Sequence, residues 1–223
     1  MKRTKLRNRL LPDYTRSEEA MNMVTHIVGG GLGVIALGLC MFQALRHGDG
    51  FALMGAVVYG CSMILLYTLS SIYHGLMPST GKKVLQVLDH CTIYVLIAGT
   101  YTPIALCALR QANPVLGWGM LAFQWALAAL AVTLTAIDLK KYNVFSMICY
   151  IGMGWAILPF IKIARQSIGQ TGFSFLLWGG IAYTIGAVLY GIGSKKRWFH
   201  SVFHIFVVLG SFLQLLCVAF FVL

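Results

Sequence analysis

The sequence has few charged residues. Asp, Glu, Lys and Arg make up 10% of its 223 positions, whereas hydrophobic residues make up 59%. A typical soluble domain carries about 25% charged residues, so this chain lacks the polar groups that cover a surface in water. The alternating pattern of a membrane β-barrel is also absent. The apolar runs are long and nearly continuous, which is typical of helices that cross a membrane and satisfy their own backbone hydrogen bonds.

Paired cysteines and phosphate-binding signatures are missing as well. The six cysteines lie in or at the ends of apolar segments and form no CxxC pair, so they are interpreted as small buried hydrophobic residues. The glycines between Gly29 and Gly33 follow no predicted strand, which favours close helix packing over a phosphate loop. Glu18 and Glu19 interrupt the stretch before the first apolar run, so that run predicts a retained helix rather than a secretory signal.

Long apolar segments are what the sequence does contain. A helix needs about 20 residues to cross the hydrocarbon core, which is about 30 Å thick. We predict an all-α polytopic membrane protein in which seven transmembrane helices form one domain, residues 17–223, after a basic cytoplasmic arm at residues 1–16. Pro103 and Pro159 are expected to kink the third and fifth helices. The predicted spans are 20–44, 52–76, 84–109, 115–138, 143–163, 172–193 and 199–222.

Basic residues are divided unequally between the two sides of these spans. The arm and the loops on its side hold 13 Lys and Arg residues, and the opposite side holds 4. Because such residues concentrate in cytoplasmic loops, we expect the N-terminus inside and the C-terminus outside. The net charge of +11 is attributed to this orientation and to anionic lipid headgroups at the arm and loops, not to nucleic acid. The sequence identifies no protein partner.

Histidines gather at one predicted depth, in the cytoplasmic half of the membrane. Imidazole and charged groups are costly there and usually mark a functional site. His200 and His204 are four residues apart, so they share one helix face and can bind one metal ion. His74 lies at the matching depth on another helix, and a third nitrogen ligand would give a zinc site with an open position for water. A pair of interfacial histidines that cap carbonyls or contact headgroups is the alternative.

Two further residues extend the zinc hypothesis. Ser70 precedes His74 by one turn and is expected to face the same cavity. Asp89 lies at a similar depth, where it can orient a ligand ring or accept a hydrogen bond from a water molecule. His90 points about 100° away from Asp89 around the helix, which favours packing or hydrogen bonding.

The first helix carries a polar face of its own. Glu19, Asn22 and His26 are spaced to share this face, and they are interpreted as a structural polar cluster. His26 is also a candidate ligand.

Several segments resemble, in the same order, the motifs of the haemolysin III family of the progestin and adipoQ receptor superfamily, whose members have seven spans. These segments are Glu19-x-x-Asn22-x-x-Thr25-His26, Ser70-Ser71-Ile72-Tyr73-His74, Asp89-His90-Cys91-Thr92-Ile93-Tyr94, Ala98-Gly99-Thr100-Tyr101-Thr102-Pro103 and His200-Ser201-Val202-Phe203-His204. The resemblance runs from about residue 17 to the C-terminus. This chain has Gln214 at an outer position where many members carry another histidine.

The resemblance implies zinc held by His74, His200 and His204, with Asp89 and Ser70 nearby. Zinc can lower the pKa of a bound water from 15.7 to about 7, which would allow attack on an amide or ester carbonyl of a membrane lipid. Asp89 would then be the general base, and Ser70 would assist the oxyanion or the water. The superfamily is similar in its motifs to alkaline ceramidases, which supports a lipid amidase or esterase.

Two other functions stay open at the level of sequence. A non-enzymatic sensor or regulator of membrane state would use zinc to clamp the second and seventh helices. A haemolysin-type cytolysin is the weaker alternative, because a secreted lysin needs a soluble form and this chain consists almost entirely of spans. The family resemblance implies a role in membrane lipid homeostasis, which fits both the hydrolase and the sensor.

Overall fold

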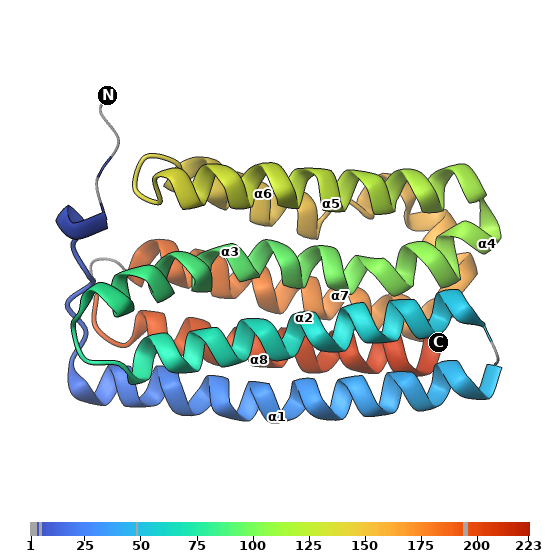
Figure 1. Ribbon diagram of the computed structural model, residues 1–223. Helices are drawn as coiled ribbons and strands as arrows, with labels where there is room; N and C mark the ends of the chain where they lie inside the picture. Colours follow the sequence, from blue (N-terminus) through green and yellow to red (C-terminus); the bar gives the residue numbers. More distant parts are fainter. Residues whose placement is uncertain (1–3, 5, 48, 194–195) are drawn as a thin grey trace.

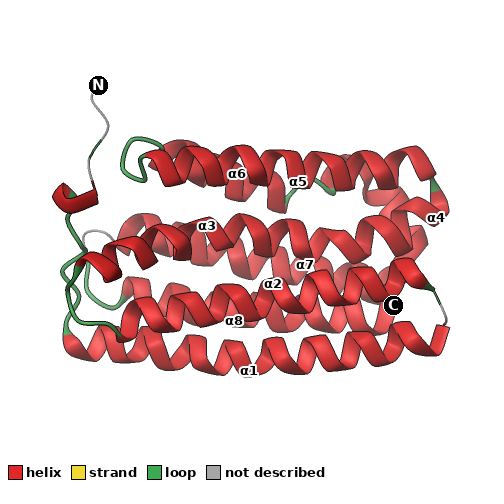
Figure 2. Ribbon diagram, in the orientation of Figure 1, coloured by secondary structure: helices red, strands yellow, loops and turns green. Residues whose placement is uncertain are grey.

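The computed structural model describes residues 4, 6–47, 49–193 and 196–223, and every regular element in these ranges is helical (Figures 1 and 2). Helices fill the length of the bundle, and most loops lie at its two ends (Figure 2). The elements are η1 (Leu6–Asn8), α1 (Arg16–His47), α2 (Gly50–Gly75), α3 (Thr80–Pro103), η2 (Ile104–Leu109), α4 (Arg110–Ala112), α5 (Pro114–Ile137), α6 (Asn143–Gly154), η3 (Leu158–Phe160), α7 (Ile161–Gly193), α8 (Phe199–Cys217) and η4 (Val218–Val222).

Polar side chains define where several helices begin. Thr15 and Glu18 form a capping box at the start of α1, since each side chain accepts a hydrogen bond from the backbone N–H of the other. Asp49, Ser79 and Asn113 precede α2, α3 and α5, and each accepts a bond from a backbone N–H in the first turn. These caps satisfy amide groups that have no partner inside the helix.

Both prolines that were expected to kink a helix lie where the α-helix changes to another helix type. Pro103 is the last residue of α3, and the chain continues as the π-helix η2. Pro159 lies in the 3-10 helix η3 between α6 and α7. Proline removes one backbone donor and clashes with the preceding turn, which explains the change of helix type at these points.

Six helical segments of the described residues are long and apolar enough to cross a membrane. They are Arg16–Arg46, Gly50–Gly75, Thr80–Ala112, Pro114–Ile137, Asn143–Gly191 and Phe199–Val222. The fifth has 49 residues and contains Gly169, whose φ of 71° and ψ of 171° are not helical. Glycine adopts a positive φ without steric cost. The chain runs out along α6 and back along the later part of α7, so the predicted fifth and sixth spans lie in this one segment (Figure 1).

Glycine lets α1 and α2 approach closely. A Cβ atom on Gly29 would overlap the ring of Tyr67, and one on Gly33 would lie 3.1 Å from the backbone nitrogen of Ile64. The predicted close packing is confirmed at these two positions, whereas Gly31 faces open space. Small residues are the usual means by which membrane helices reach such contact.

Buried hydroxyl groups join α2, α7 and α8. The phenol of Tyr67 on α2 donates a hydrogen bond to Oγ of Ser211 on α8 at 2.6 Å. The phenol of Tyr183 on α7 lies 2.7 Å from the same oxygen. Both phenols contact the hydroxyl oxygen of Ser211, which joins α8 to α2 and α7.

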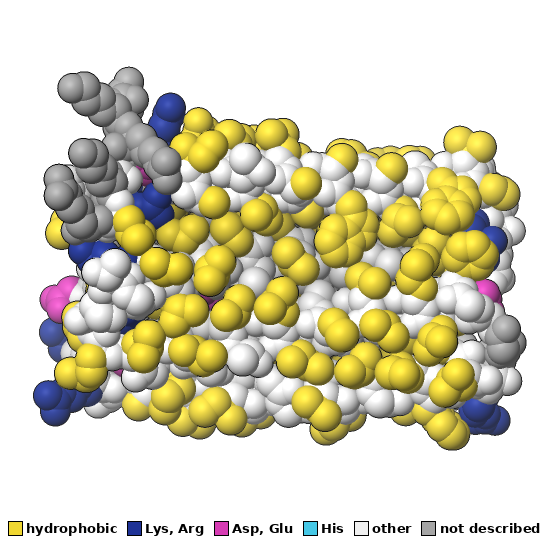
Figure 3. Space-filling model, in the orientation of Figure 1, with side chains coloured by type: hydrophobic (Ala, Val, Ile, Leu, Met, Phe, Trp, Pro, Cys, Tyr) yellow, Lys and Arg dark blue, Asp and Glu magenta, His cyan; other side chains and the backbone are white. Residues whose placement is uncertain are grey.

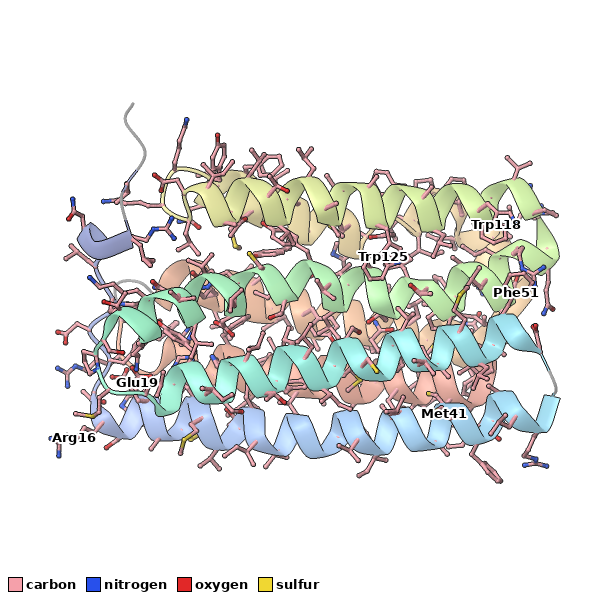
Figure 4. All side chains as sticks on the ribbon, viewed as in Figure 1. Arg16, Glu19, Met41, Phe51, Trp118 and Trp125 are labelled. Atoms are coloured by element: carbon pink, nitrogen blue, oxygen red, sulfur yellow. The ribbon has the colours of Figure 1, made fainter. Side chains whose placement is uncertain are left out.

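The bundle surface is apolar along its flank and charged at its ends. Figure 3 shows hydrophobic side chains over the flank, with basic and acidic side chains gathered at the two ends. At the end opposite Glu19, Phe51 lies close to Trp118 (Figure 4), with ring centroids 5.9 Å apart. The guanidinium of Arg110 lies 4.1 Å from the Phe51 ring centroid. Aromatic and basic residues of this kind mark the boundary between membrane and water.

Candidate metal centre

Three histidines converge inside the bundle. His74 comes from the last turn of α2, and His200 and His204 come from the first turns of α8. Each offers a ring nitrogen, and these nitrogens all lie within 4.8 Å of one another. The side chains are buried, with exposed fractions of 2%, 8% and 1%. The structure thus brings together the three residues that the sequence indicated as metal ligands.

The start of α8 is tied to the start of α1. Trp198 precedes α8 with a left-handed φ of 68°. Its backbone N–H donates a hydrogen bond of 2.7 Å to Oε1 of Glu18. Because this contact fixes the first turn of α8, it also fixes the direction in which the helix presents His200 and His204.

One carboxylate orients His74. Oε2 of Glu19 lies 2.5 Å from Nδ1 of His74, and Oε1 of the same residue accepts a hydrogen bond of 2.5 Å from Nζ of Lys82. The geometry favours the tautomer in which Nδ1–H donates to Glu19 and the lone pair remains on Nε2. Carboxylate–histidine pairs of this kind orient metal ligands and raise their basicity. Asn22 contributes an amide nitrogen 3.4 Å from Nδ1 of His74.

Several buried ring nitrogens in the cluster have no partner. Nε2 of His74 and the Nδ1 atoms of His200 and His204 are buried without a hydrogen bond. The two Nε2 atoms of His200 and His204 lie only 3.0 Å apart. A buried unsatisfied polar atom costs about 1–3 kcal/mol, so this arrangement favours a ligand that uses the lone pairs. Three neutral imidazoles are a donor set that suits zinc.

His26 lies directly beside the cluster. Its ring centroid is 3.8 Å from that of His204 and 5.0 Å from that of Tyr67. Neither of its ring nitrogens has a hydrogen-bond partner. It is not one of the three residues whose ligand atoms converge, and its contact with His204 was not apparent from the sequence.

A cavity of about 510 Å³ opens beside the histidines. Ser70, Asp89, His200 and His204 all line it, so the structure brings the two predicted catalytic side chains to the same space as two of the predicted ligands. The hydroxyl of Ser70 has no hydrogen-bond partner. Most of the remaining wall is apolar and comes from α3, α6 and α7.

His90 forms hydrogen bonds, as predicted. Its Nε2 lies 3.1 Å from the hydroxyl of Tyr190, and its Nδ1 lies 2.8 Å from the carbonyl oxygen of Gln86. Oδ2 of Asp89 is 3.7 Å from the same Nδ1. His90 therefore lines the cavity without joining the three-histidine cluster.

The sequence did not reveal two residues of the site. The ring of Tyr14 stacks on His200, with centroids 4.8 Å apart and planes inclined by 10°. Burial raises the pKa of the Tyr14 phenol, so it stays protonated at neutral pH. Lys82 was counted among the loop cations, but it is buried in the first turn of α3 beside Glu19. The capping residue Ser79 could have placed Lys82 inside the helix.

Comparison with known proteins identifies the family. The sequence matches the family model described as haemolysin-III related over residues 14–215. This chain belongs to the haemolysin III family. Hemolysin-3 of Bacillus cereus is 40% identical over 206 residues, which cover 92% of each chain. A hemolysin-3 homolog of Bacillus subtilis (strain 168) is 35% identical over 208 residues, which cover 93% of this chain and 96% of that one. Together with the six apolar helical segments, membership of the haemolysin III family identifies an integral membrane protein.

Proposed function

We propose that this haemolysin III family protein binds zinc and hydrolyses an amide or ester bond of a membrane lipid, as part of membrane lipid homeostasis. The observation that carries the proposal is the convergence of three buried histidine nitrogens within 4.8 Å, beside a large and mainly apolar cavity. His74, His200 and His204 would hold the ion. When bound, zinc supplies Lewis acidity toward a carbonyl oxygen and acidifies a water molecule.

The surrounding residues have roles that fit hydrolysis. Asp89 would accept the proton of the attacking water, since it lines the same cavity as His200 and His204. The hydroxyl of Ser70 has no competing partner and would donate to the developing oxyanion. Glu19 would keep Nε2 of His74 available by holding its other nitrogen.

The cavity fits a lipid better than a water-soluble substrate. Its volume of about 510 Å³ is within the usual range for small-molecule sites, about 300–1,000 Å³. Its walls include apolar side chains such as Leu96, Ile97, Phe173 and Leu176. Such walls would receive an acyl chain while the polar bond lies near Ser70 and Asp89.

The proposal is tested by lipid hydrolysis with purified full-length protein. The substrates are an N-acyl sphingoid amide and a glycerolipid ester, and released fatty acid is measured by mass spectrometry. We expect release from at least one class, its loss after chelation, and its return when zinc is restored. Protein that holds about one zinc per chain but releases fatty acid from neither class would contradict hydrolysis.

A non-enzymatic sensor is the second candidate. Glu19, His74 and the two α8 histidines come from α1, α2 and α8, so a metal here would clamp three helices together. This role predicts that zinc removal lowers thermal stability in protein that shows no hydrolysis. The same preparations therefore separate the two functions.

We also infer seven spans, with the N-terminus in the cytoplasm of a bacterial cell and the C-terminus outside. The break at Gly169 falls between the predicted fifth and sixth spans, and the two termini lie at opposite ends of the bundle, as an odd number of crossings requires (Figure 1). The excess of Lys and Arg on the N-terminal side supports this orientation. Alkaline phosphatase fused after Leu223 should be active in a bacterial host, because it folds outside the cytoplasm. An inactive but stably expressed fusion would contradict the orientation.

A further inference from the structure

One mouth of the cavity is formed by the N-terminal segment. Thr4, Asn8, Arg9 and Leu10 line it at the end of the bundle where α1 begins. Asp138, Leu139 and Lys140, from the turn between α5 and α6, line the cavity beside this segment. Residues of the basic arm thus make up part of the cavity wall, a position that their sequence does not indicate.

Arg9 is a buried charged residue of this segment. Its exposed fraction is 9%, and Nη2 donates hydrogen bonds to the carbonyl oxygens of Ile137 at 3.1 Å and Ala136 at 3.5 Å. It therefore caps the last turn of α5. Nε and Nη1, however, are buried without any partner. A guanidinium carries donors and no acceptor, so these N–H groups require acceptor atoms as partners.

The neighbouring charges leave Arg9 without a direct counter-ion. Oδ2 of Asp138 accepts the backbone N–H of Thr4 at 2.8 Å, and Oδ1 accepts that of Lys141 at 3.1 Å. These bonds, together with the more distant charge of Arg9, lower the pKa of Asp138 to about 2. Among the described residues, Asp138 and Arg9 form no ion pair. Lys140 also lines the cavity here, so the described residues at this mouth supply two cations, Arg9 and Lys140, and one carboxylate, Asp138.

We propose that Arg9 is an anion-binding site at the mouth of the cavity, which takes a phosphate group in the manner of a phospholipid headgroup. Its Nε–H and an N–H of Nη1 would each donate to a phosphate oxygen, a pairing that suits the guanidinium fork. The apolar wall deeper in the cavity would receive the hydrocarbon part of the same molecule. This site requires neither the metal nor hydrolysis, so it goes beyond the proposed function.

The test compares two lipids and two variants by native mass spectrometry of the full-length protein in detergent. The lipids are lysophosphatidylglycerol, which is anionic, and lysophosphatidylcholine with the same acyl chain. The variants are Arg9→Gln and Arg16→Gln, which remove the same charge from the same segment, although Arg16 is exposed and does not line the cavity. We expect Arg9→Gln to bind the anionic lipid about tenfold more weakly, or worse, and Arg16→Gln to match the wild type.

Other outcomes decide against the site or identify its ligand. Equal weakening in both variants would show a general surface charge effect, and no weakening in either would likewise overturn the proposal. Competition by inorganic phosphate that disappears in Arg9→Gln would support the site with a free anion as its ligand. If Arg9→Gln fails to fold, Arg9→Lys replaces it, because lysine keeps the positive charge but lacks the paired donors of the guanidinium. We expect Arg9→Lys to bind the anionic lipid several-fold more weakly than the wild type. His74→Ala should bind the anionic lipid normally, which separates this site from the metal centre.

Discussion

Replacing His200 or His74 with alanine should reduce bound zinc from about one ion per chain to nearly none. Each substitution removes one of three nitrogens that converge within 4.8 Å, and two remaining imidazoles form an incomplete donor set. The two residues lie on different helices, so equal losses would show that the ion bridges α2 and α8. The measurement is metal content by inductively coupled plasma mass spectrometry on protein purified in detergent.

The matched control for this experiment is His90→Ala. His90 lines the same cavity but bonds to Tyr190 and Gln86, so its loss should leave the zinc in place. Zinc that persists in both His74→Ala and His200→Ala, in monodisperse protein, would rule out the three-histidine centre. A wild-type protein without zinc would remove the basis for metal-assisted hydrolysis.

Replacing Asp89 with asparagine should lower lipid hydrolysis by about 10²–10⁴-fold while zinc content stays near one per chain. The carboxylate lines the cavity beside the histidines without belonging to their cluster, so its proposed task is proton transfer. Asparagine keeps the size of the side chain but cannot accept the proton. Turnover is measured as fatty acid release at saturating substrate, with metal content determined on the same sample.

Asp13→Asn is the control for this change, because Asp13 is an exposed acid on the N-terminal segment and does not line the cavity. It should retain full activity. If Asp89→Asn loses zinc together with activity, Asp89 acts through the metal site and not as the proton acceptor. Unchanged turnover would exclude it from the chemistry.

Features that depend on local spacing along the chain could be predicted from the sequence. Each apolar run predicts a helix because a chain in a membrane must satisfy its own backbone hydrogen bonds. The four-residue spacing of His200 and His204 places both rings on one face of α8, as expected. The predicted boundary between the fifth and sixth spans, residues 164–171, contains Gly169, where the helical geometry breaks.

Contacts across long sequence separations could not be predicted in the same way. Glu19 and Lys82 are 63 residues apart, and no periodic pattern links them. The stacking of Tyr14 on His200 and the burial of Arg9 depend on how the N-terminal segment crosses the end of the bundle. That path is set by tertiary packing, whereas composition alone indicated a basic arm at a membrane surface.

The contact between Glu18 and Trp198 has a consequence for biogenesis. It joins the first long helix to the last across 180 residues, and the histidine cluster likewise needs both α2 and α8. During synthesis the N-terminal helices emerge first. The contacts of α1 and α2 with α8 can therefore form only after the last helix has been made. If the protein binds zinc as proposed, the ion would be loaded after the final helix is inserted, because a chain that stops before α8 lacks His200 and His204.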